Sequence, residues 1–167
     1  MHTVRIIGPG RAGSSLAAAL AAARWEVAGL LGRGEHLGTA AVGVDVLVLA
    51  VPDDRVSEVA RAVRPSPRCA VLHLSGSLGL DVLAGHHRRG SLHPLVPLPN
   101  PATGARRLAG GAAFAVAGDA LAGTMARALG GTVLEVADDR RPAYHAAATI
   151  AANHVVALMG QVERVAA

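Results

Sequence analysis

Short apolar runs alternate with glycine- and proline-rich turns along most of the chain. Continuous apolar runs of about four to eight residues are typical of strands buried on both faces of a parallel sheet. Longer alanine- and leucine-rich runs, with apolar positions three and four apart, are typical of helices packed on such a sheet. We expect strands within 4–7, 26–31, 44–51, 69–74, 90–95, 112–117 and 132–136, and helices within 12–23, 36–41, 53–63, 78–84, 119–129 and 143–165.

This order of elements predicts an α/β fold, since strands that alternate with helices form parallel sheets covered on both faces. We expect a doubly wound, mostly parallel Rossmann sheet within residues 1–140. A long C-terminal helix follows within 141–167, where we expect the start of a helical dimerisation or substrate domain.

The first strand runs directly into Gly8-Pro9-Gly10-Arg11-Ala12-Gly13, which has the spacing G-x-G-x-x-G. Gly8 allows a sharp turn, Gly10 lets the backbone approach a pyrophosphate, and Gly13 lets helix and strand pack closely. The following helix offers free N–H groups and the positive end of its dipole to phosphates. We predict a dinucleotide site at Gly8, Gly10, Arg11, Ala12 and Gly13. The alternative is a glycine-rich turn without a ligand.

The end of the second strand indicates which dinucleotide fits. NAD-binding chains usually place an acid about 20 residues after the glycine turn, whereas a nearby arginine accommodates the 2′-phosphate of NADP. Here the strand ends in Gly32-Arg33-Gly34 with no acid at its tip, which favours NADP through Arg33. Glu35 keeps NAD possible. The alternative is that Arg33 is an ordinary exposed loop residue.

Two strand ends are predicted to border the same crevice, because ligands of open α/β sheets bind outside the carboxyl ends of the strands. The strand 44–51 ends at Val51-Pro52, and we expect both residues to contact the cofactor. The next residues, Asp53 and Asp54, are expected to cap a helix rather than to act as catalytic carboxylates. Ser75 follows the strand 69–74 and is predicted to offer its hydroxyl to substrate or nicotinamide ribose, unless it or Ser77 caps the next helix.

Histidines supply the candidate proton-transfer groups. His93 lies at a predicted crevice edge, before a proline-rich loop through Pro101 that we expect to fold over the site. His145, Thr149 and Asn153 are four residues apart on the long helix and form an uncharged polar stripe, which favours a site over a solvent-exposed face. His73 is expected to be structural within a strand. The remaining histidines singled out here are expected on the surface or in loops: His2, His36, His86 and His87.

Composition narrows the class of protein. The chain has 167 residues, of which 51% are hydrophobic and mostly small, and aromatic residues make up only 2%. This scarcity argues against a nucleic-acid binder that stacks bases. The net charge is +4, and every basic residue is an arginine, without an arginine-rich run. Cys69 is the one cysteine, so no disulfide or cysteine metal site is predicted. The apolar run 42–52 is too short to span a bilayer, and we expect a cytoplasmic protein with no metal site.

With these pieces placed, the chain resembles the 6-phosphogluconate and β-hydroxyacid dehydrogenase superfamily. Within it, the chain is most similar to a bacterial group of Rossmann-like NADP-dependent oxidoreductases that carry a helical C-terminal domain of unknown function. The resemblance covers essentially the whole chain. It rests on the segments GPGRAGSSL, LAVPDD, LSGSL, SLHPL and YHAAATIAANHVVAL, the last being the most specific.

The resemblance implies hydride transfer between NADPH and a small oxo-acid, ketopantoate- or β-hydroxyacid-like, held near Ser75 and Asn153. Relatives place a lysine that handles the proton four residues before an asparagine that orients substrate. Here Asn153 matches the asparagine, but Thr149 stands at the lysine position. The proton role then falls to His145 or to His93, whose His-Pro context is similar to that of prephenate dehydrogenases. We expect arginines near the cleft, such as Arg141, to hold the substrate carboxylate.

Relatives also continue into a helical domain that dimerises and closes the site, so the resemblance implies that this domain is mostly missing here. We expect a homodimer in which the long helix hides Leu158, Met159 and Val162 against a second copy. Two alternatives stay open. One is a non-catalytic NADP-binding module or a truncated remnant of such an enzyme. The other is a flavin or deazaflavin as redox partner.

Overall fold

The computed structural model describes residues 1–166. Its centre is a seven-stranded sheet in the order β2-β1-β3-β4-β5-β6-β7. Neighbouring strands are parallel from β2 to β5, β6 is antiparallel to β5, and β7 is parallel to β6. The predicted mostly parallel Rossmann sheet is therefore confirmed. The strands are β1 (Thr3–Ile7), β2 (Glu26–Leu31), β3 (Val46–Leu49), β4 (Ala70–His73), β5 (Arg88–Pro94), β6 (Ala113–Gly118) and β7 (Thr132–Glu135).

Helices cover both faces of this sheet, as a doubly wound fold requires. On one face, α1 and α4 bury Leu16, Leu20 and Met125 against β1, β3 and β6, and α3 contributes Leu108. On the other face, α2 buries Val56 against Leu47 and Leu49 of β3. Each fully buried leucine contributes about 1.5–3 kcal/mol. These helices are α1 (Arg11–Ala22), α2 (Asp53–Ala62), α3 (Pro101–Ala109) and α4 (Ala120–Ala128), and single 3₁₀ turns form at Leu80–Leu83 and Asp138–Arg140.

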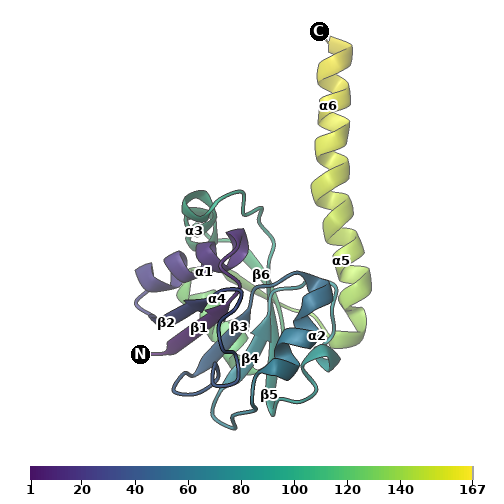
Figure 1. Cartoon of the computed structure of the whole chain (residues 1–167). Helices are drawn as coiled ribbons and strands as arrows, with labels where there is room; N and C mark the ends of the chain where they lie inside the picture. The colour runs from purple at the N-terminus through teal and green to yellow at the C-terminus, as the bar shows by residue number, and fades with distance from the viewer. Residues whose placement is uncertain (167) are drawn as a thin grey trace.

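The long C-terminal helix is present and projects away from the sheet (Figure 1). It consists of α5 (Arg141–Thr149), a π-helical turn (Ile150–His154) and α6 (Val155–Ala166). Five of its apolar side chains are between 52% and 59% exposed, at Ile150, Val155, Leu158, Met159 and Val162. No helix within residues 1–166 has the length and apolar character needed to cross a membrane. The division of the chain into domains at residue 140 stays a prediction.

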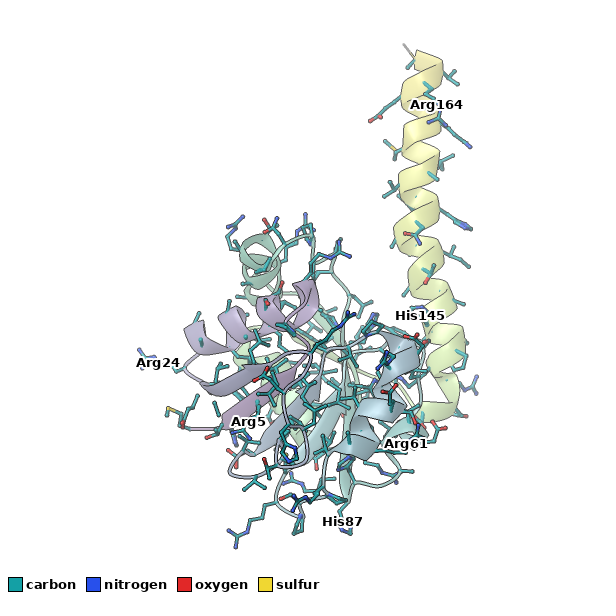
Figure 2. All side chains as sticks on the ribbon, viewed as in Figure 1. Arg5, Arg24, Arg61, His87, His145 and Arg164 are labelled. Carbon is teal, nitrogen blue, oxygen red and sulfur yellow. The ribbon has the colours of Figure 1, made fainter. Side chains whose placement is uncertain are left out.

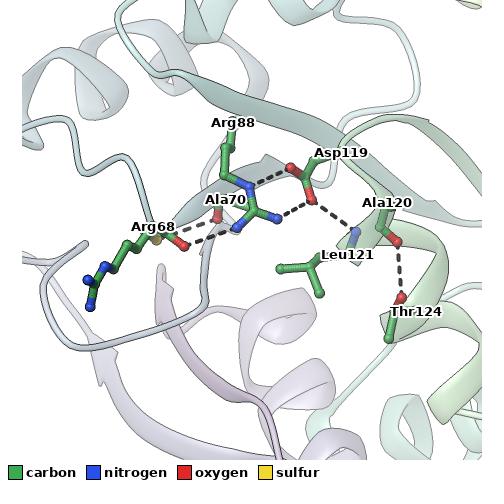
Figure 3. Close-up of polar contacts among 8 residues, drawn as sticks. Arg68, Ala70, Arg88, Asp119, Ala120, Leu121 and Thr124 are labelled. Carbon is green, nitrogen blue, oxygen red and sulfur yellow. Dashed lines mark hydrogen bonds and ion pairs between the residues drawn. The ribbon is translucent and has the colours of Figure 1, made fainter.

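One bidentate ion pair joins β5 to α4 (Figure 3). Arg88 Nε donates to Asp119 Oδ2 at 2.8 Å, and a second guanidinium nitrogen donates to Oδ1 at 3.0 Å. The same Asp119 carboxylate caps α4, because it accepts from the Leu121 N–H. Arg88 also donates to the Arg68 carbonyl before β4. This pair fixes the strand that carries His93 at its other end.

The elements differ from the sequence predictions in two places. The predicted helix within 36–41 is wrong, because Gly38 lies within a segment too short to propagate helically, and these residues form turns. The sequence prediction also missed α3, which follows the proline-rich loop. Asn100 caps it by accepting from the Thr103 N–H at 2.9 Å, and Pro101 occupies its first turn. Asn-Pro is a helix-start signal that the surrounding prolines obscured.

Candidate functional site

The glycine turn after β1 has the shape of a phosphate-binding turn. Gly8 has φ +108°, a conformation that other residues rarely adopt, and a Cβ there would overlap the Ala50 carbonyl. A Cβ on Gly13 would overlap the Gly8 carbonyl. The fold itself therefore requires glycine at these two positions. A Cβ on Gly10 would have no atom within 4 Å, so the chain's own packing does not require glycine there.

A cavity of about 820 Å³ opens beside this turn. That volume falls within the usual range for nucleotide-sized ligands, roughly 300–1,000 Å³. The cavity lies between the ends of β1, β2 and β3 and the helix α2. Its lining includes five residues predicted for the cofactor: Gly8, Gly10, Arg33, Val51 and Pro52. Arg11 and Ala12 lie beside it in the first turn of α1, where Arg11 is exposed and Ala12 half-buried.

Arg33 and Glu35 take different positions at the far end of the cavity. The Glu35 carboxylate accepts a hydrogen bond from the Gly32 N–H, so it is turned back onto the backbone. Arg33 is exposed on the cavity wall. Within residues 1–166, Arg33 forms no ion pair. An unpaired guanidinium is suited to bind a phosphate in a bidentate manner.

Asp53 binds the Ser75–Ser77 loop instead of capping α2, so the capping prediction for it is wrong. The helix α2 has Pro52 at its cap position and no side-chain cap. Asp53 Oδ2 accepts from Ser75 Oγ at 2.6 Å and from Ser77 Oγ at 3.0 Å. Ser75 Oγ in turn accepts from the N–H groups of Ser77 and Leu78. The Ser75 hydroxyl thus donates a hydrogen bond to Asp53 and organises the loop. The alternative that one of these serines caps the next helix is wrong, because Gly79 occupies the cap position of the turn Leu80–Leu83 and no side chain caps it.

The structure brings His93 and His145 together, although 51 residues lie between them in the chain. Their ring centroids are 6.1 Å apart. Gly76 lies against both rings, since a Cβ there would come within 2.7 Å of His145 Nδ1 and 2.8 Å of His93 Cε1. Figure 2 shows His145 near the base of the long helix, at the edge of the sheet domain. Both imidazoles therefore border the same edge of the sheet as the glycine turn, beyond the carboxyl ends of the parallel strands.

Tyr144 is a member of this cluster that the sequence analysis did not single out. Its hydroxyl lies 2.8 Å from His93 Nδ1, and the two rings meet edge to face. Burial lowers the pKa of His93 to about 4, and the positive charges of a protonated His145 and of Arg141 act in the same direction. Burial also raises the pKa of Tyr144. At neutral pH both groups are uncharged, so each can donate and accept hydrogen bonds.

Arg141 does not hold a substrate, contrary to the sequence prediction. Its side chain is fully buried and its nitrogens donate to three protein oxygens. Nε donates to the Leu78 carbonyl at 2.7 Å, and the two terminal nitrogens donate to Ser91 Oγ at 2.7 Å and the Ser75 carbonyl at 2.6 Å. From the sequence alone, an arginine at the start of a helix is expected to be exposed, which is why its burial was not predicted. Here the residue ties α5 to the Ser75–Ser77 loop and to β5.

The other two members of the predicted polar stripe lie farther along the long helix. Thr149 and Asn153 are exposed, and Asn153 belongs to the π-helical turn. The structure therefore brings His145 into the cluster, while Asn153 lies in the turn between α5 and α6. Figure 1 shows that the helix projects away from the sheet beyond α5.

Two further histidines are buried. His73 is structural, as expected, and is fully buried in β4. His86 was expected on the surface, but it is only 5% exposed because its Nε2 lies 3.0 Å from the Ala60 carbonyl at the end of α2. Neither ring nitrogen of His73 has a hydrogen-bond partner within residues 1–166. Burial, with the charge of Arg141, lowers the pKa of His73 to about 4.

The buried His73 gives a prediction for acid stability. Its pKa is below the ordinary histidine value of 6.5, so between pH 6.5 and about pH 4 the unfolded chain binds a proton that the folded chain does not. Stability should fall as the pH falls through this window, by about 3 kcal/mol from this residue. In His73→Leu we expect this part of the loss to disappear, while the contribution of His93, whose pKa is also lowered to about 4, remains. Urea unfolding of both proteins at pH 7 and pH 4.5 measures this loss of stability. An identical pH dependence in both proteins would contradict the assignment.

The family model described as a domain of unknown function, DUF2520, matches residues 112–167, about a third of the chain. The match includes α5, which carries Tyr144 and His145. The chain matches no curated protein.

Solved structures share the fold over most of the chain. Protein TM1727 from Thermotoga maritima has a TM-score of 0.71 at 19% identity, over 97% of this chain and 68% of that one. Plasmodium falciparum pyrroline carboxylate reductase with NADP bound has a TM-score of 0.69 at 16% identity, over 96% and 67% of the two chains. Prephenate dehydrogenase from Aquifex aeolicus has a TM-score of 0.68 at 16% identity, over 84% and 63%. Likeness at these identities shows a shared Rossmann-like fold, and the superfamily resemblance stays a prediction.

Proposed function

We propose that the protein is an NAD(P)-dependent oxidoreductase that prefers NADPH and acts on a small oxo-acid. The observation that carries this proposal is the cavity beside the glycine turn, where Gly10 leaves a space that the chain does not fill. The fold and the NADP-bound structure that shares it support a dinucleotide as the occupant. The substrate class, ketopantoate- or β-hydroxyacid-like, rests on the sequence resemblance.

The residues around the cavity suit the parts of such a cofactor. The N–H groups at the start of α1, from Arg11 onward, face a pyrophosphate that approaches at Gly10. Arg33 would bind a 2′-phosphate. Val51 and Pro52, after β3, would contact another part of the cofactor. NADPH, when bound, supplies a hydride. Glu35 is held on the Gly32 N–H, which leaves Arg33 to decide the preference for NADPH over NADH.

Proton transfer is assigned to the histidine cluster. In the reducing direction the imidazolium form of His145 gives a proton to the substrate oxygen, and in the oxidising direction the neutral imidazole takes it back. His93, which burial keeps neutral at pH 7, can only hydrogen-bond that oxygen. Their ring nitrogens border the Ser75–Ser77 loop, which Asp53 and Arg141 hold in place. Because protein oxygens fully engage Arg141, it is not available to bind the substrate carboxylate.

Replacing either histidine tests the mechanism. We expect His93→Ala and His145→Ala to lower kcat, the latter by about 10²–10⁴ because His145 transfers the proton. The measurement is NADPH oxidation with a panel of oxo-acids. His87→Ala is the control, because His87 is exposed at the opposite end of the sheet domain (Figure 2). Unchanged turnover in both cluster variants would show that the mechanism is wrong.

A second candidate is an NADP-binding module without turnover. The exposure of Thr149 and Asn153 favours it, because the residue proposed to orient the substrate does not border the histidine cluster. Tight NADPH binding without oxidation by any oxo-acid would support this module. If NADPH is instead oxidised by a flavin or a deazaflavin, that molecule would be the redox partner.

We also propose that the long helix forms a homodimer. The five apolar side chains named above are each more than half exposed, a patch typical of an interface. Pairing of two such helices would bury them. Sedimentation at micromolar concentration tests this, and a strictly monomeric profile would contradict it.

A further inference from the structure

The chemistry of Tyr144 and His93 and the charge near them determine which of the two donates the hydrogen bond between them. The Tyr144 hydroxyl and His93 Nδ1 are 2.8 Å apart, so one of them donates. A phenol is a stronger donor than a neutral imidazole N–H, and an imidazole nitrogen is a stronger acceptor than a phenol oxygen. The nearby positive charge of Arg141 makes the phenol a better donor still, since it favours withdrawal of the hydroxyl proton. Tyr144 therefore donates.

A hydrogen bond in this direction fixes the tautomer of His93. An imidazole that accepts at Nδ1 while neutral carries its proton on Nε2. Within residues 1–166, Nε2 of His93 makes no hydrogen bond, and it is not among the buried nitrogens that lack a partner. It is therefore accessible to a substrate oxygen.

His145 has no such partner. Its Nδ1 is buried and makes no hydrogen bond within the described chain. An unpaired buried nitrogen costs about 1–3 kcal/mol whether or not it carries the proton, so no contact of this kind fixes the tautomer of His145. Only His93 depends on Tyr144, because only its Nδ1 has a partner.

We propose that Tyr144 is a positioning residue that holds His93 with its proton on the accessible Nε2, so that His93 donates a hydrogen bond to the oxygen of the reacting carbonyl. The role of that hydrogen bond in catalysis rests on the proposed function. The tautomer itself does not, because it follows from contacts within this chain. Tyr144 would thus act through His93 without touching the substrate.

Nitrogen-15 NMR of the histidine rings tests the tautomer directly, without cofactor or turnover. At pH 7 we expect His93, assigned through a His93→Gln variant, to show an unprotonated, hydrogen-bonded Nδ1 and a protonated Nε2. In Tyr144→Phe, the Nδ1 shift should lose its hydrogen-bonded character and a fraction of Nδ1–H should appear. His145 serves as the internal control and should keep its tautomer.

Two results would overturn the proposal. One is a protonated Nδ1 on His93 in the wild-type protein, which would mean that Tyr144 accepts. The other is an unchanged His93 spectrum in Tyr144→Phe. The wild-type spectrum decides the first point even if the variant fails to fold. Failure of the proposed function would instead show as absence of NADPH binding with the His93 spectrum as expected, so the two failures are distinguishable.

Discussion

Replacing Arg141 by methionine is expected to destabilise the folded protein by about 3 kcal/mol. The substitution removes three hydrogen bonds and leaves the carbonyls of Ser75 and Leu78 and the Ser91 hydroxyl without that donor. Each buried group left unsatisfied costs about 1–3 kcal/mol. Part of this cost is offset, because the variant no longer has to remove a charged guanidinium from water when it folds. Denaturant unfolding of the two proteins measures the difference.

Arg140 provides a matched control one residue away. Its side chain is 79% exposed and lies 3.9 Å from the Asp139 carboxylate. Arg140→Met should change stability by no more than about 0.5 kcal/mol. Equal stability of the Arg140 and Arg141 variants would contradict the structural role assigned to Arg141. We further expect Arg141→Met to expose the start of α5 to limited proteolysis, because that side chain ties α5 to β5 and the Ser75–Ser77 loop.

Gly13→Ala is expected to lower the stability of the fold, whereas Gly10→Ala is expected to weaken NADPH binding and leave the stability nearly unchanged. Gly13→Ala should destabilise the fold by about 3 kcal/mol, because its Cβ would overlap the Gly8 carbonyl and press on the Ala50 side chain. Gly10→Ala should leave the fold within about 1 kcal/mol of wild type, because no atom lies within 4 Å of the new Cβ. It should nevertheless weaken NADPH binding at least about tenfold, by holding the pyrophosphate away from the turn.

Thermal unfolding and a fluorescence titration with NADPH separate these two effects. Gly10→Ala is the informative variant, since a stable protein with weakened binding places the phosphates at this turn. Unchanged NADPH affinity in a folded Gly10→Ala protein would show that the pyrophosphate does not approach Gly10.

The sheet was predictable because its signals are local. The central strands β3 and β4 are buried on both faces and appear in the sequence as apolar runs, with His73 the one polar residue among them. The glycine turn was predictable for the same reason, since its three glycines, its strand and its helix are contiguous. The helix α3 was missed because prolines before it indicate a loop, although Asn100 and Pro101 supply a cap and a helix start.

The site was only partly predictable, because its contacts join distant parts of the chain. Asp53 fits a local helix cap, but its partners Ser75 and Ser77 follow the neighbouring strand. Arg141 begins a helix and would be solvent-exposed in isolation, yet β5 and the serine loop enclose it. Tyr144 is the chain's one tyrosine and directly precedes His145, which was a usable signal. Its partner His93 could not be identified without the fold.

The cofactor site is best tested by titration of the purified protein with NADPH and NADH, followed by nicotinamide fluorescence. We expect NADPH to bind more tightly than NADH, and Arg33→Ser to reduce this preference without unfolding the protein. That result would support the cavity beside the glycine turn as a dinucleotide site. Binding of neither nucleotide to the folded protein would contradict the proposed function.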